Sequence, residues 1–139
     1  GNFSAGVITA TATAARYADL AEKYATDTDY EYGTVVVFGG EKEVTVTSES
    51  NSAKVAGVIS TDPAYMMNAG AEGQYVALTG RVPTKVTGPV AKGDLMVSSS
   101  VPGHAKADNN ASAGRIIGKA IESKEGDDNG VIEVLVNMM

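Results

Sequence analysis

The sequence predicts an all-β fold: a compact β-barrel or β-clip-like domain made of two pseudo-repeated β units, with an extended N-terminal arm and one short helix. Composition is the first indication, because the 139 residues include 16 Gly and no Trp and are rich in Val, Thr, Ser and Ala. Short apolar runs separated by turn sequences, at the spacing typical of barrels and sandwiches, are the second. An internal repeat is the third.

The expected strands are short apolar or alternating segments, each bounded by turn residues. In chain order they are Thr34–Phe38, Glu43–Thr47, Lys54–Ser60, Gln74–Thr79, Val82–Thr87, Leu95–Ser98, Arg115–Ile121 and Val131–Asn137. We expect Gly80-Arg81 to form a turn or a bulge between two of these strands. Asn129-Gly130 predicts a hairpin turn just before the last one, since Asn-Gly favours such turns.

The internal repeat relates the first half of the β region to the second. Segment 33–37 matches 93–97, segment 55–57 matches 116–118, and segment 73–78 matches 130–135. Both halves follow the order Gly-led strand, variable hairpin, x-x-Gly strand, Gly-led strand. The pattern therefore predicts two related units around a shared core.

Residues 1–24 differ from the β region. Residues 1–15 alternate small and apolar side chains but have too few large ones for a core, so we interpret them as an arm that packs on a neighbouring subunit; a tether is the alternative. Tyr17, Leu20, Ala21 and Tyr24 fall at i, i+3, i+4 and i+7 and predict a short helix over 16–24. We therefore divide the chain into an intersubunit segment, 1–24, and a β domain, 25–139.

Charge and residue inventory exclude several classes of function. The net charge of −6 disfavours binding to nucleic acid or to anionic membranes. The absence of Cys removes disulfides, thiolate nucleophiles and Cys-ligated zinc. No apolar run approaches the roughly 20 residues that a membrane-spanning helix needs. We therefore expect neither nucleic acid as a partner nor insertion into a membrane.

Two small groups of residues are candidate sites of chemistry. His104, the one histidine, would have to serve any Ser-His-Asp triad, but it follows Pro102-Gly103 in a turn and is better interpreted as a polar loop residue. Asp27, Asp29 and Glu31 alternate as ligands of a hard cation can, but the full calcium-loop pattern is missing and a solvated acidic loop is favoured. We predict no catalytic residue, no metal and no cofactor.

Apolar residues of the arm, the predicted helix and a Met-rich patch are the candidates for an assembly interface. The patch, Tyr65-Met66-Met67, follows Asp62-Pro63 and is expected on a loop, where Met adapts to irregular contacts. The full set is Phe3, Val7, Ile8, Tyr17, Leu20, Tyr24, Tyr65, Met66 and Met67.

Four segments resemble the C-terminal region of bacteriophage tail-fibre and neck-appendage proteins, especially those of marine cyanophages. They are Ala15–Tyr24, Tyr32–Gly40, Lys54–Tyr65 and Leu78–Gly93. The A-D-x-A-E pattern in the first also resembles autoproteolytic chaperone domains of phage fibres. The resemblance implies an extracellular or virion structural protein, commonly trimeric, that is not a turnover enzyme. It makes Asp19 and Glu22 the residues to examine for a single self-cleavage.

The leading interpretation is therefore a structural module of an extracellular fibre or virion appendage, whose partners are copies of itself and other virion proteins. A filament subunit that polymerises head to tail by strand donation is the first alternative. A carbohydrate-binding module for host-surface glycans is the second, although the sequence has only 6 Tyr and 2 Phe to stack on sugars. An enzyme is the least supported class.

Overall fold

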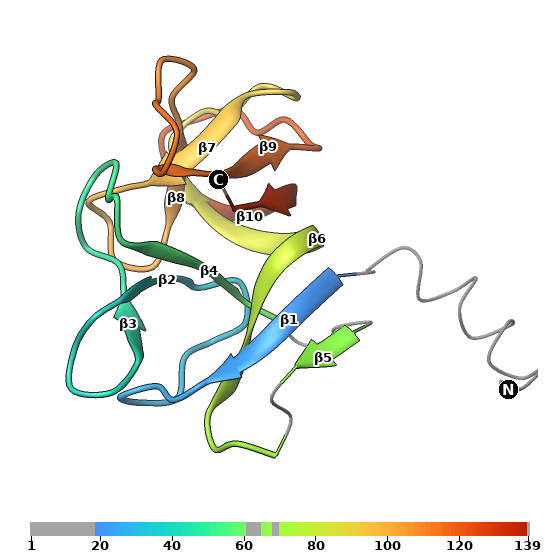
Figure 1. Cartoon of the computed structure of the whole chain (residues 1–139). Coiled ribbons are helices and arrows are strands. Elements are labelled where there is room, and N and C mark those ends of the chain that lie inside the picture. Colours follow the sequence, from blue (N-terminus) through green and yellow to red (C-terminus); the bar gives the residue numbers. More distant parts are fainter. Residues whose placement is uncertain (1–18, 61–64, 68–69, 139) are drawn as a thin grey trace, which may run out of the picture.

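The computed structural model describes residues 19–60, 65–67 and 70–138, and these residues form ten strands and no helix (Figure 1). The first five strands are β1 (Asp19–Tyr24), β2 (Val35–Phe38), β3 (Val44–Val46), β4 (Val55–Ile59) and β5 (Tyr65–Met67). The other five are β6 (Gln74–Thr87), β7 (Leu95–Ser98), β8 (Ala105–Ala107), β9 (Ile116–Ala120) and β10 (Asn129–Asn137). The all-β prediction is confirmed.

Five of the strands close into a barrel. β10 pairs antiparallel with β6 and with β9, β9 pairs with β7, and β7 pairs with β8. β8 returns to β6 through one parallel pair, Val86 with Ala105, which completes the ring. The barrel interior is filled by side chains that are at most 5% exposed, among them Val82, Met96, Ile117, Ile132 and Val134.

The remaining strands repeat this ring in the first half of the chain. β6 pairs with β1 and β4, β4 pairs with β2, and β2 pairs with β3. An isolated parallel bridge between Thr26 and Val44 links β3 to the chain just after β1, at the place equivalent to the pair Val86 and Ala105. We call residues 19–79 the first unit and residues 80–138 the second unit.

Strand register shows that the two units are a true repeat. In the first unit Val36 pairs with Gly57, and the register shifts at the next residue. In the second unit Met96 pairs with Gly118, and the register shifts at the same place. The predicted repeat is therefore confirmed for these strands, with Gly57 equivalent to Gly118.

The third match of the predicted repeat is one position out of register. A Cβ on Gly57 would lie 2.3 Å from the carbonyl oxygen of Ala77, and one on Gly118 would lie 2.0 Å from that of Leu135. Ala77 is thus equivalent to Leu135, whereas the predicted match of 73–78 with 130–135 aligned Leu78 with Leu135. That match relied on glycine position, but backbone packing sets the register.

The predicted helix over 16–24 is wrong for the residues that the structure describes. Residues 19–24 form β1, which pairs antiparallel with β6 on one edge and parallel with β5 on the other. So short a segment does not hold a helix without tertiary support, and here the tertiary partners bind an extended strand. The division of the chain after residue 24 stays a prediction, although β1 hydrogen-bonds to the body of the domain.

Two predicted turns are part of longer strands. Gly80 and Arg81 lie inside β6, which runs through 14 residues from the strands of the first unit to those of the second (Figure 1). Gly80 has a φ of +117°, and the pairing of β1 with β6 shifts register close by, which agrees with the bulge that was the alternative expectation and not with a turn. Asn129 and Gly130 pair with Thr87 and Val86 as the first residues of β10.

The close approach at Gly118 yields the first testable prediction. Gly118→Ala places a methyl group against the Leu135 carbonyl, so the ladder between β9 and β10 must shift, and we expect a loss of about 3 kcal/mol of unfolding free energy. Urea unfolding followed by circular dichroism measures it. Gly70→Ala is the control, because a Cβ there meets nothing within 4 Å. Equal midpoints for Gly118→Ala and the native chain would contradict the proposed register.

Candidate assembly surface

The outward face of β10 carries two exposed apolar side chains. Along this strand Ile132, Val134 and Val136 point into the barrel, whereas Val131 is 60% exposed and Leu135 is 49% exposed. The strand is hydrogen-bonded along both edges, to β6 and to β9. These two apolar groups are therefore held in fixed positions on the surface.

Leu135 also belongs to an apolar groove across the outside of the second unit. The groove encloses about 300 Å³ over β7, β9 and β10, and we call it the β10 groove. Its lining residues are Leu95, Ile116, Gly118, Lys119, Leu135 and Asn137. Three large aliphatic side chains and one lysine make this surface suited to a protein partner, since apolar contact with a charged rim is typical of such interfaces.

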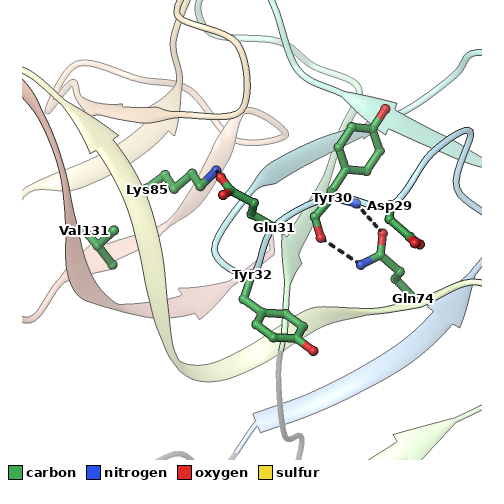
Figure 2. A pocket seen from close by; sticks show the side chains of 7 residues that line it. All are labelled: Asp29, Tyr30, Glu31, Tyr32, Gln74, Lys85 and Val131. Atoms are coloured by element: carbon green, nitrogen blue, oxygen red, sulfur yellow. Dashed lines mark hydrogen bonds and ion pairs between the residues drawn. The ribbon is translucent and has the colours of Figure 1, made fainter.

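A second hollow lies where the two units meet, and we call it the inter-unit depression (Figure 2). It encloses about 750 Å³ and is lined by Asp29, Tyr30, Glu31, Tyr32, Gln74, Lys85 and Val131. Figure 2 shows the Glu31 carboxylate against the Lys85 ammonium, which is an ion pair between the two units. The side-chain amide of Gln74 pairs with the backbone of Tyr30 through two hydrogen bonds of 2.9 Å.

Two exposed acidic residues of the loop that borders the inter-unit depression have lowered pKa values because they accept hydrogen bonds. Lys85, by its hydrogen bond and then its charge, lowers the pKa of Glu31. Hydrogen bonds from the hydroxyls of Tyr30 and Thr45 lower the pKa of Asp27 at the other end of the loop. Tyr32 follows Glu31 and is 63% exposed, so its aromatic ring is accessible to solvent.

The alternating acidic residues at 27–31 do not bring their carboxylates together. Asp27 accepts hydrogen bonds from Tyr30 and Thr45, while Glu31 pairs with Lys85 in the other unit. Within the described ranges, no group of three or more His, Cys, Asp and Glu side chains is placed to hold a metal ion. The loop thus uses two of its three acids as structural hydrogen-bond acceptors.

His104 lies in a turn that its own backbone stabilises. Its Nδ1 is 2.8 Å from the Pro102 carbonyl oxygen, and its carbonyl oxygen accepts hydrogen bonds from the backbone N–H and the hydroxyl of Ser99. The imidazole is therefore engaged within its own loop, in agreement with its interpretation as a polar loop residue.

Asp19 and Glu22, the candidates for self-cleavage, have partners on different elements. Asp19 is 5% exposed and accepts a 2.7 Å hydrogen bond from the Ser60 hydroxyl. Glu22 accepts a hydrogen bond from the Tyr24 hydroxyl, and burial, then the charge of Glu22, raises the pKa of Tyr24. Residues three apart share a face on a helix but point to opposite faces on a strand, so β1 does not make the two carboxylates converge.

The predicted interface residues fall into two groups. Phe3, Val7, Ile8 and Tyr17 lie outside the described residues. The others lie on β1 and β5, which pair in parallel through Leu20 with Tyr65, the neighbouring Ala21 with Met66, and Glu22 with Met67.

The patch at 65–67 is thus a strand rather than the expected loop. Met67 is 39% exposed, which leaves it accessible for contact. Leu20 and Tyr24 are half-buried, and Tyr24 packs edge-to-face on Phe38 with ring centroids 5.5 Å apart. Their apolar surface is already used in part within the subunit.

Leu135, which lines the β10 groove, is missing from the predicted interface. The signal is present in Val131-Ile132-Glu133-Val134-Leu135-Val136, where apolar residues occupy positions of both parities. Such a run is typical of a strand covered on both faces. It therefore indicates that the outside of the last strand, as well as its inside, is apolar.

The chain was compared with known proteins. No protein-family model matches it, and no curated protein matches it. Within the described part of the chain, no helix has the length and apolar character needed to cross a membrane.

The hydrogen bonds at Asp27 predict a dependence of stability on pH. Because the folded-state pKa of Asp27 lies below its ordinary value of 3.8, the ionised group stabilises the fold above that value, and this is lost as pH falls through the folded pKa. We expect Asp27→Asn to lower the melting temperature at pH 7 and to differ less from the native chain in strong acid. Scanning calorimetry across the acid range measures both, with Asp29→Asn as the control in the same exposed loop. A constant difference at every pH would contradict this role.

Proposed function

We propose that the chain is a structural subunit of an extracellular fibre or virion appendage, similar to a phage tail-fibre module, and that it assembles with copies of itself. The β10 groove is the observation that carries this proposal. The strands of a closed barrel have no free edges, so the barrel itself can associate only through its outer side chains. Leu95, Ile116 and Leu135 provide that contact on a rigid frame.

A second feature, an open strand edge outside the barrel, also supports assembly. Among the described residues, β5 pairs with β1 alone, so its other edge is open to an added strand. Residues 1–15 of a neighbouring copy have the alternating small side chains that such strand addition accepts. Continued from copy to copy, the same contact would give the head-to-tail filament that is our first alternative.

A structural role, without enzymatic turnover of a substrate, agrees with the chemistry of the described residues. Nothing in their arrangement, or in the comparisons, points to enzymatic activity. Asp19, Glu22 and His104 each hydrogen-bond within the fold. We therefore assign the polar groups of these residues to holding strands and turns in place.

If the chain assembles as proposed, its sedimenting mass should rise with concentration, and assembly should require the arm, residues 1–15. The full chain should sediment as an oligomer at micromolar concentration, and deletion of residues 1–15 should abolish assembly while far-UV circular dichroism still reports a folded β domain. The physical reason is that the arm lacks enough apolar side chains to bury itself. A full chain that stays monomeric up to about 100 μM, weaker than most specific interfaces, would refute the proposal.

The inter-unit depression favours a glycan-binding module as a second candidate. Sugars stack on exposed aromatic rings and exchange hydrogen bonds with carboxylates, amides and ammonium groups. Tyr32 offers the ring, and Asp29, Gln74 and Lys85 offer the polar groups around it.

A glycan array tests this candidate with two aromatic variants. We expect any binding by the native chain to fall at least tenfold in Tyr32→Ala, because the stacking face is removed. Phe38→Ala is the matched control: Phe38 is 45% exposed but lies outside the depression. Absence of binding by the native chain, or an equal loss in both variants, would eliminate the candidate.

A further inference from the structure

We propose that the β10 groove is the docking site for the first unit, residues 19–79, of a second copy of this chain, so that copies associate head to tail. The inference rests on the proposed assembly function and names the surface and the partner. It follows from the internal repeat, because the same face of the repeat is covered in one unit and open in the other.

In the first unit this face is fully buried by the second unit. It consists of Val35, Val55, Val58 and Ala77, which are at most 7% exposed. All four belong to the same core cluster as the interior residues of the second barrel. The interior of the first unit forms a separate cluster with Val36, Val44, Ala56, Ile59 and Val76. The covered face is thus the outer side of the β2–β4–β6 sheet.

The equivalent positions in the second unit line the β10 groove. Strand register relates Val35 to Leu95, Val55 to Ile116, Val58 to Lys119, and Ala77 to Leu135. All four equivalents are among the six residues of the groove. The repeat therefore places an apolar docking face at the end of the tandem, where the described chain supplies no further unit to cover it.

Backbone hydrogen bonding at the β10 groove suits a contact made through side chains. In the first unit the Val35 N–H donates to the Gly103 carbonyl of the second unit, at 2.9 Å. In the second unit the Leu95 N–H donates instead to the Asn109 side chain, at 2.8 Å, and Asn109 is held by Asp94. The groove thus exposes apolar groups without an unpaired N–H at Leu95, as a surface between separately folded copies requires.

Charge selects the first unit as the occupant. Residues 19–79 contain ten acidic and three basic residues, whereas residues 80–139 contain seven of each. Lys119 stands in the groove where the first unit has Val58, so an acidic partner is favoured and a second copy of the groove is disfavoured by like charge. The contact is therefore between unlike faces, which gives a closed ring such as a trimer or an open filament, but not a two-fold dimer.

Sedimentation equilibrium of matched variants tests the groove. We expect Leu135→Asp and Lys119→Glu each to raise the dissociation constant at least tenfold, with Lys119→Glu also weakening the dependence on salt. Val131→Asp is the control, because Val131 is exposed on the same face of β10 but outside the groove; it should change the constant less than twofold. Both test positions are exposed, so Lys119→Glu keeps the test valid if Leu135→Asp unfolds.

Cross-linking identifies the occupant. A benzophenone amino acid at position 135, in a mixture of ¹⁴N and ¹⁵N chains, should give intermolecular cross-links to peptides from 19–79. Cross-links to 80–139 or to 1–18 would overturn the inference, as would native-like association of both groove variants, while leaving assembly itself in place. A native chain that never associates would instead remove the proposed function together with the inference.

Discussion

The continuous strand β6 is the constraint on which the rest of the structure depends. A strand has two edges, and every buried backbone group on them needs a partner. β6 meets this need twice, with β1 and β4 along its first half and with β10 and β8 along its second. Because one strand serves both rings, the rings lie against each other, and the outer face of the first joins the core of the second.

This arrangement makes two similar units unequal. The first unit has polar or aromatic groups such as Tyr24 and Tyr30 packed against its small core of five buried residues, whereas the second has a larger core that includes residues from both units. Most of the negative charge lies in the first unit, and the ion pair between Glu31 and Lys85 joins acid from the first to base from the second. The two units therefore differ in charge and in the size of their cores.

The features of the fold that could be predicted are those that residues close together in the sequence determine. Gly57 and Gly118 recur in x-x-Gly strands because a neighbouring carbonyl leaves no room for a side chain, so the repeat was visible without a structure. The identity of β1 was not visible, since Leu20 and Tyr24 fit a helical face as well as a strand, and β6, which is distant in the sequence, decides between them. β5 and β8 have three residues each, too few for any periodicity. The sequence of β10 has apolar residues at positions of both parities, but this pattern does not tell which strands lie beside each face, so the β10 groove was not predicted.

Among the described residues, the tandem of two units ends on a face that no further unit covers. Repeat proteins that remain monomeric resolve this with a terminal unit whose outer face is polar. Here the change is partial: Lys119 replaces the apolar Val58, but Leu95, Ile116 and Leu135 keep the apolar character of their buried counterparts. An apolar face that the described residues leave uncovered is best explained by a partner that covers it, and the head-to-tail contact proposed above would supply one.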